Sequence, residues 1–147
     1  MKRLLPVLLV TAATLTVGCA QTPPQITVDN TPLEAPTRII ADITPQEAFD
    51  LIQSNKNNPD FVIIDVRTQA EFDSGHIENA INIDYNPETF RDELNNLDKN
   101  KTYLVYCAGG WHSADAVATM KKLNFLTVYN MLGGINRWQA EGLQTVK

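Results

Sequence analysis

From residue 38 onward, short apolar runs alternate with stretches in which apolar residues recur every three or four positions. The run FVIIDV at residues 61–66 is continuous and rich in β-branched residues, which is typical of a strand buried on both faces. A second run, TYLVY at 102–106, ends directly at a cysteine. Shorter strands are expected at residues 39–40, 80–83 and 125–129.

Helix signals stand between these runs. Thr44-Pro45-Gln46-Glu47 is a capping box with proline at the first helical position. Further helices are expected at residues 86–97, 113–123 and 134–141. Alternation of five strands with helices predicts a single α/β domain of three layers, in which helices cover both faces of a five-stranded, mainly parallel sheet.

The first 18 residues predict an export signal. Lys2 and Arg3 precede an uncharged, mostly apolar run from residue 4 to residue 18. Fifteen helical residues span roughly 22 Å, less than the ~30 Å hydrocarbon core of a bilayer, so this run is typical of a signal peptide. Residues 15–19 (LTVGC) resemble the lipobox of bacterial lipoproteins, although Thr16 stands where Leu is usual. That resemblance implies that Cys19 is acylated and becomes the first mature residue; the alternative is a plain secretory signal with an incidental cysteine.

A proline-rich segment separates Cys19 from the predicted domain at 38–147. Residues 19–37 contain four of the eight prolines and show no sustained apolar period, which predicts an extended tether. An acylated Cys19 would anchor the chain to a membrane on the periplasmic side. Ala20 follows the cysteine and, by the same resemblance, favours the outer membrane.

The charge of the chain argues against one class of partner. The whole chain has 147 residues and a formal charge of −5, and all 17 acidic residues follow Cys19. Without the first 18 residues the charge becomes −7, from 10 basic and 17 acidic residues. No basic stripe is visible in the sequence, so nucleic acid is not an expected partner.

Cys107 is the second of only two cysteines, and it follows the predicted strand at 102–106. Ligands of parallel sheets bind beyond the carboxyl ends of the strands. The residues that follow and that we expect to bind substrate are Ala108, Gly109, Gly110, Trp111, His112 and Ser113. Two glycines let backbone N–H groups converge, and the helix behind them adds its positive dipole end, so this loop favours a reactive thiolate. The alternative is an ordinary turn with a chance cysteine.

Three groups of motifs carry a family resemblance. They are DVR at 65–67 with EF at 71–72 and GHI at 75–77, CAGGWHS at 107–113, and LGG at 132–134 with Trp138. In this order they resemble the rhodanese-like sulfurtransferases, over residues of roughly 38–145. The resemblance implies a persulfide on Cys107, which takes sulfur from an anionic donor such as thiosulfate and passes it to cyanide, a small thiol or a protein thiol. It implies no metal and no organic cofactor.

Single residues of these motifs suggest further roles. His112 stands where the family often has Arg; because histidine titrates near neutrality, we expect weaker and pH-dependent recruitment of anions. Trp111 is either an exposed docking platform or a lid over the turn. Asp65 and Arg67 lie at a strand end near the loop, where they tune the site or form an internal ion pair. His76 is expected to be a structural histidine.

Three functions remain open at the level of sequence. The first is an anchored sulfurtransferase with Cys107 as its nucleophile, and the second is a non-catalytic interaction or persulfide-carrier module. The third is a cysteine phosphatase, which needs Arg six residues after the cysteine to clamp phosphate. That position holds Ser113, so the phosphatase is the least favoured of the three.

Overall fold

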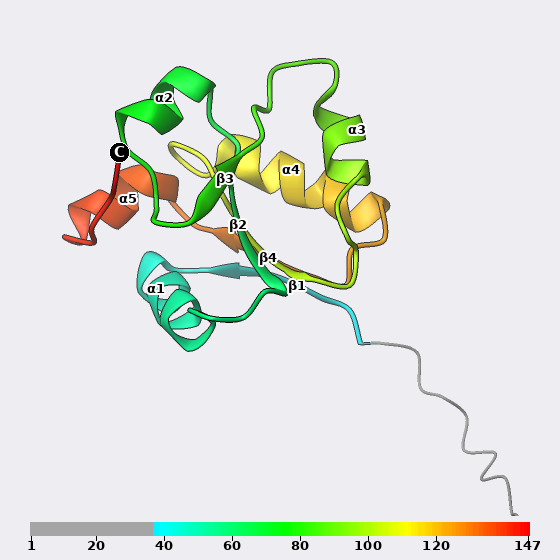
Figure 1. Cartoon of the computed structure of the whole chain (residues 1–147), viewed down its shortest axis with the longest axis horizontal. Coiled ribbons are helices and arrows are strands. Elements are labelled where there is room, and N and C mark those ends of the chain that lie inside the picture. Colours follow the sequence, from blue (N-terminus) through cyan, green and yellow to red (C-terminus); the bar gives the residue numbers. More distant parts are fainter. Residues whose placement is uncertain (1–36) are drawn as a thin grey trace, which may run out of the picture. The chain divides into compact units, whose positions relative to one another are not determined.

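The computed structural model describes residues 37–147, and all five strands of that region lie in one parallel sheet (Figure 1). The strands are β1 (Ile39–Ile43), β2 (Phe61–Asp65), β3 (Ala80–Asn82), β4 (Thr102–Tyr106) and β5 (Thr127–Met131). Their order across the sheet is β1-β5-β4-β2-β3. Every neighbouring pair is parallel, so the predicted fold class is confirmed. The export signal, Cys19 and nearly all of the tether lie outside the described residues.

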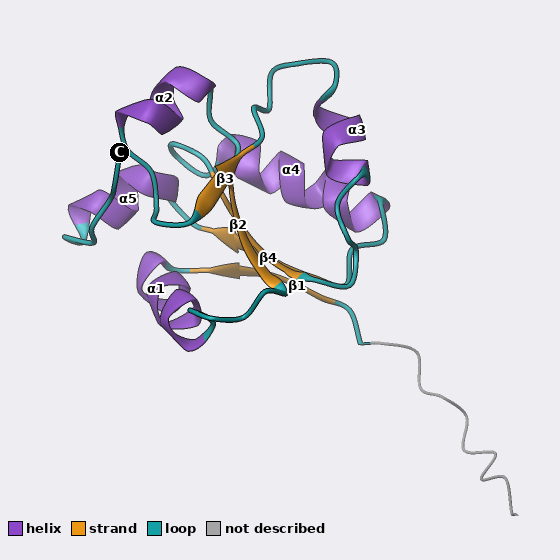
Figure 2. Cartoon of the chain, in the orientation of Figure 1, coloured by secondary structure: helices purple, strands orange, loops and turns teal. Residues whose placement is uncertain are grey.

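Helices cover both faces of the sheet (Figure 2). They are α1 (Pro45–Ser54), α2 (Gln69–Ser74), α3 (Phe90–Asn95), α4 (Trp111–Lys122) and α5 (Gly134–Ala140). One core cluster joins α3 and α4 to one face, with Leu94, Met120 and Val105 at its centre. A second cluster joins α1 and α5 to the other face and includes Leu104 and Trp138, which is buried as a core residue. No helix within 37–147 is both long and apolar enough to cross a bilayer.

One helix, α2, was not predicted. It has only six residues and buries none of them, so it has no apolar period to detect. Its signal is instead a second capping box, in which Thr68 accepts from the Glu71 N–H and the Glu71 carboxylate accepts from the Thr68 N–H. The helix closes on Gly75 and leads the chain back towards β3.

Three elements begin at a residue other than the predicted one. β5 begins at Thr127 rather than at residue 125, because Phe125 turns into the core and packs edge-on against Tyr103, with ring centroids 5.2 Å apart. α3 begins at Phe90 rather than at residue 86, because Asn86 is held in a turn by the Asp84 carboxylate. α4 begins at residue 111, two residues early, which moves two of the predicted loop residues onto a helix.

Candidate active site

Cys107 lies immediately beyond the carboxyl end of β4, where the chain turns into α4. The residue is only 3% exposed, and its Sγ accepts a hydrogen bond of 3.0 Å from the Gly110 N–H. Gly110 has φ of 101°, a left-handed conformation that residues with a Cβ rarely adopt. The glycine therefore makes the turn that points a backbone donor at the sulfur.

The rest of the loop keeps free backbone donors. The N–H groups of Trp111, His112 and Ser113 belong to the first turn of α4 and have no intrahelical acceptor. Within residues 37–147, these three groups and those of Ala108 and Gly109 also have no other protein acceptor. Together with the dipole of a twelve-residue helix, they suit the binding of an anion.

The N-terminus of α5 holds this loop from behind. The Ile135 N–H donates to the Cys107 carbonyl at 2.9 Å, and the Asn136 N–H donates to the Ala108 carbonyl at 3.1 Å. Gly134 permits this approach, because a Cβ there would collide with both carbonyl oxygens. These contacts give the LGG motif a role that the sequence alone did not assign to it, which is to fix the backbone of the cysteine loop.

Asp65 and Arg67 form a buried ion pair next to β4. The Arg67 Nη2 lies 2.6 Å from the Asp65 Oδ2, and the two side chains are 8% and 0% exposed. Nη2 also donates to the Gly75 carbonyl at 2.7 Å, which ties the end of α2 to the end of β2. Burial opposes the charge of Arg67, but the hydrogen bonds and negative charge of Asp65 outweigh it and raise the pKa of the guanidinium. The charge is therefore permanent but already neutralised by its partner.

Tyr106 extends this buried cluster up to the cysteine. Its ring lies under the Arg67 guanidinium, 5.9 Å from ring centroid to carbon, and its hydroxyl accepts from the Ile77 N–H at 3.1 Å. Burial, and then the negative charge of Asp65, raise the pKa of the Tyr106 hydroxyl well above its ordinary value. Because Tyr106 directly precedes Cys107, this neutral phenol fixes the strand end from which the loop departs.

Trp111 and His112 stand on α4 and not in the loop, where they were predicted. Trp111 is 85% exposed, so it does not fold down as a lid. The His112 ring stacks on Tyr85, with centroids 4.7 Å apart and planes 6° apart. Tyr85 in turn donates to the Asp115 carboxylate at 3.3 Å. Tyr85 follows β3 in the chain and belongs to no motif, so no sequence pattern indicated that it contacts the start of α4.

Ser113 contributes only its backbone to the loop surface. Its side chain is fully buried, and its Oγ donates to the Gly110 carbonyl at 3.2 Å. The position at which a cysteine phosphatase needs a guanidinium therefore holds a short hydroxyl that braces the turn. His76, as expected of a structural histidine, stacks on Phe72 at 3.8 Å between centroids and contacts the Phe72 carbonyl through Nδ1.

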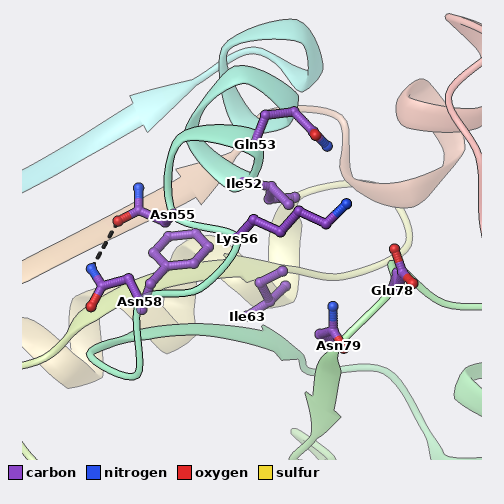
Figure 3. Close-up of a pocket in the computed structure, with 9 residues that line it drawn as sticks. Ile52, Gln53, Asn55, Lys56, Asn58, Ile63, Glu78 and Asn79 are labelled. Carbon is purple, nitrogen blue, oxygen red and sulfur yellow. Dashed lines mark hydrogen bonds between the residues drawn. The ribbon is translucent and has the colours of Figure 1, made fainter.

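Two cavities lie elsewhere, between α1, the chain before β3 and the C-terminal segment. Figure 3 shows the first, of about 260 Å³, which is lined by Ile52 and Lys56 from α1 and the turn after it, and by Glu78 from the chain before β3. The second, of about 340 Å³, is lined by Phe49, Trp138 and neighbouring apolar side chains. Neither is lined by any residue of 107–113. We take the loop as the chemical site, because the nucleophile and the free N–H donors are there.

Comparisons with known proteins agree with this geometry. The family model of the rhodanese-like domain matches residues 44–141. Among curated proteins, the tRNA uridine(34) hydroxylases of Erwinia tasmaniensis and Photorhabdus laumondii are each 32% identical over 120 and 115 residues, which are 70% and 67% of this chain. These stretches are 34% and 32% of those proteins. The chain thus spans about a third of the length of the curated relatives it matches.

Solved structures show the same fold. A rhodanese-related protein from Thermoplasma volcanium is 31% identical with a TM-score of 0.62, covering 72% of this chain and 97% of its own. A rhodanese-like domain protein from Staphylococcus aureus is 34% identical with a TM-score of 0.59, covering 73% and 99%. A protein from Rhodopseudomonas palustris described as a possible tyrosine phosphatase is 26% identical with a TM-score of 0.60, covering 73% and 85%.

Proposed function

Because this chain belongs to the rhodanese-like domain family, we propose that it is a sulfurtransferase that carries sulfane sulfur as a persulfide on Cys107. The observation that supports this most directly is the loop geometry. The Cys107 Sγ accepts from the Gly110 N–H at 3.0 Å, and five further N–H groups of the same loop and helix start have no acceptor among residues 37–147. A thiolate and an anionic persulfide are the species that such donors stabilise.

The proposed reaction has two displacement steps. In the first, the Cys107 thiolate attacks the outer sulfur of an anionic donor such as thiosulfate. The sulfur–sulfur bond of the donor breaks, its electron pair leaves with sulfite, and Cys107 becomes a persulfide. In the second, cyanide or an acceptor thiolate attacks the outer persulfide sulfur, and the electron pair of that bond returns to Cys107. No net oxidation occurs, and each step needs only a nucleophile and a leaving group.

The surroundings of the loop support the same proposal through positioning. The N-terminus of α5 donates hydrogen bonds to the carbonyls of Cys107 and Ala108. These two acceptors are therefore satisfied, and the free N–H groups of the loop remain available to an anion. The Asp65–Arg67 pair fixes the neighbouring strand end, and its charge is internally balanced. The His112 imidazole, held on Tyr85, is the side chain that would meet a donor at the start of α4.

An interaction or persulfide-carrier role is the second candidate, and the exposure of Trp111 supports it. An 85% exposed tryptophan beside a buried cysteine offers a contact surface for a protein acceptor thiol. The tRNA hydroxylation named for the curated relatives is not part of the proposal, since the chain spans about a third of them.

We further propose that acylation of Cys19 anchors the chain on the periplasmic side of a membrane, with the outer membrane favoured by Ala20.

Mass spectrometry of the purified protein after exposure to thiosulfate tests the chemistry. We expect Cys107 to gain the mass of one sulfur atom, and the gain to disappear on addition of cyanide with release of thiocyanate. Sulfur uptake without release to cyanide or to a small thiol would favour a carrier that passes its sulfur to a protein thiol. No uptake would leave the interaction module as the function. For the anchor, equal membrane partition of the parent protein and Cys19→Ala in fractionated cells would exclude lipidation.

A further inference from the structure

The amino ends of the strands form the edge of the sheet that lies opposite Cys107. The first residues of four strands lie level in the sheet, because Ile39 pairs with Thr127, Thr127 with Thr102, and Thr102 with Phe61. The segments that lead into these strands therefore meet at one edge. We call this group of segments the amino edge. It consists of residue 38 and residues 55–60, 96–101 and 121–126.

The amino edge concentrates basic residues that are scattered in the sequence. Its charged residues are Arg38, Lys56, Lys99, Lys101, Lys121 and Lys122 with Asp60 and Asp98. Even when Glu78, which precedes the shorter strand β3, is added, six basic residues stand against three acidic ones. In the remainder of 38–147, four basic residues stand against twelve acidic ones. The domain is acidic as a whole, so this edge is a local reversal of its charge.

Contacts between the segments hold these charges together. Arg38 donates from Nη2 to the Asn124 side chain at 3.1 Å and from Nη1 to the Lys121 carbonyl at 3.5 Å. The Leu126 N–H donates to the Lys99 carbonyl at 3.0 Å. These partners are neutral, so the charge of Arg38 is not cancelled, and the contacts join the segments that carry Lys99, Lys121 and Lys122.

The acidic residues of the edge neutralise little of it. Lys101 Nζ lies 3.8 Å from the Asp60 carboxylate, which is 73% exposed to solvent. Lys101 also donates to the Pro59 carbonyl at 2.8 Å. Exposed pairs at this distance contribute at most about 1 kcal/mol and are screened by salt. The edge therefore keeps a net positive potential.

We propose that the amino edge binds the anionic headgroups of a phospholipid surface, and that this contact turns Cys107 away from the membrane. The described domain joins the preceding chain at Thr37–Arg38, at this edge. Four strand starts lie on one level, so the segments that carry these cations gather at one end of the sheet. Ile39, 42% exposed, adds an apolar side chain at the same edge.

Nucleic acid fits these observations less well than lipid does. Binding of single strands uses exposed aromatic rings on which bases stack. Among the described residues the one strongly exposed aromatic side chain is Trp111. It lies close to Cys107 at the carboxyl ends of the strands, which we call the carboxyl edge. β4 has five residues, so the two edges are roughly 16 Å apart. The proposal goes beyond sulfur transfer and does not depend on it.

Vesicle flotation tests the proposal with the chain from Ala20 to Lys147, which cannot be acylated. Both core clusters consist of residues within 40–143, so this chain contains the complete folded domain. We expect flotation with vesicles of mixed phosphatidylglycerol and phosphatidylcholine, none with phosphatidylcholine alone, and loss of binding as salt rises. Equal flotation with both kinds of vesicle, or with neither, overturns the proposal.

A matched pair of variants locates the contact. Each basic residue near an anionic surface is worth about fivefold in affinity, so Lys121→Gln/Lys122→Gln should weaken binding roughly 30-fold. Arg91→Gln/Lys147→Gln removes the same charge outside the amino edge and should change it less than about twofold. Equal losses in the two variants would mean that net charge alone drives binding. Tighter binding of tRNA than of the mixed vesicles, lost in the first variant, would assign the edge to nucleic acid instead.

Tryptophan fluorescence tests the orientation. The chain has two tryptophans, and Trp138 is buried while Trp111 is exposed at the carboxyl edge. On mixed vesicles, we expect Trp111 to remain accessible to acrylamide and unquenched by lipids with brominated acyl chains. Quenching of Trp111 by those lipids would show that the carboxyl edge faces the bilayer, which contradicts the proposed orientation. The rate of sulfur transfer from thiosulfate, measured without vesicles, tests the proposed reaction independently of membrane binding.

Discussion

The two edges of the sheet use charge in opposite ways. At the amino edge, Lys121 and Lys122 are exposed, Arg38 donates to neutral groups, and Lys101 lies 3.8 Å from the exposed Asp60 carboxylate. At the carboxyl edge, Asp65 and Arg67 are buried and neutralise each other. One edge leaves its charge available for a partner, whereas the other uses charge to fix the backbone around Cys107 and leaves the site itself to backbone N–H groups. Substitutions at each edge should therefore affect different measurements.

Replacement of the nucleophile should produce the largest effect. Cys107→Ser should lower thiosulfate:cyanide sulfur transfer by roughly a thousandfold or more, because the hydroxyl does not ionise at neutral pH and cannot form a persulfide. The control is Lys121→Gln/Lys122→Gln, which should retain the full rate in the absence of vesicles. Steady-state thiocyanate formation measures both. Residual transfer above a few per cent in Cys107→Ser would place the chemistry elsewhere.

The second largest effect should come from breaking the buried ion pair of Asp65 and Arg67, which should lower the free energy of unfolding. Arg67→Met leaves the Asp65 carboxylate buried without a partner, which should reduce the free energy of unfolding by about 3–5 kcal/mol. The control at the amino edge is Lys101→Met, where the exposed pair with Asp60 should cost less than about 1 kcal/mol. Urea denaturation measures both variants. Adding Asp65→Asn to Arg67→Met should recover much of the loss, and a double variant no more stable than the single one would contradict this account.

The third largest effect should come from disturbing the contact between α5 and the cysteine loop. Gly134→Ala forces a Cβ into the carbonyls of Cys107 and Ala108 at φ of 57°. Gly142→Ala is a matched control, since Gly142 has φ of 79° but nothing within 4 Å of an added Cβ. The left-handed conformation should cost about 1–2 kcal/mol in both variants, and the collision should add about 1–3 kcal/mol in Gly134→Ala alone.

Activity separates these two glycine variants further. Because the collision displaces the loop that holds Cys107, Gly134→Ala should also lose sulfur transfer when assayed where it is still folded. Gly142→Ala should keep the parent rate. If the two variants proved equally stable and equally active, the α5 contact would not position the loop.

Local patterns in the sequence were sufficient to predict the fold and the position of Cys107 in the turn between β4 and α4. The run at residues 61–66 and the run ending at Cys107 are continuous β-branched or aromatic stretches, and such stretches form buried parallel strands because both faces must be apolar. The turn after Cys107 needs Gly110, which has a left-handed φ of 101°. Each of these signals lies within a few neighbouring residues.

The features that the sequence did not reveal depend on residues far apart in the chain. The stack of Tyr85 on His112 joins the segment after β3 to α4, and Tyr85 belongs to no motif. The amino edge is similar, since strand register brings together residue 38 and the segments 55–60, 96–101 and 121–126, which lead into four different strands. A search for adjacent basic residues sees only Lys121-Lys122 in this domain. The short helix α2 was missed for a different reason, because it buries no apolar residue.

The smallest predicted effect concerns His112, where the chain departs from the common family pattern. His112→Arg places a permanent charge and a planar pair of donors at the start of α4, next to the path of an anionic donor. After screening by solvent and salt, this charge should be worth about 1 kcal/mol, or roughly fivefold in kcat/KM for thiosulfate. Asn100→Arg adds the same charge at the amino edge, roughly 16 Å away along β4, and should change kcat/KM by less than about twofold. Equal increases in both variants would indicate a general effect of net charge. No increase in either would mean that the side chain at position 112, held against Tyr85, does not meet the donor.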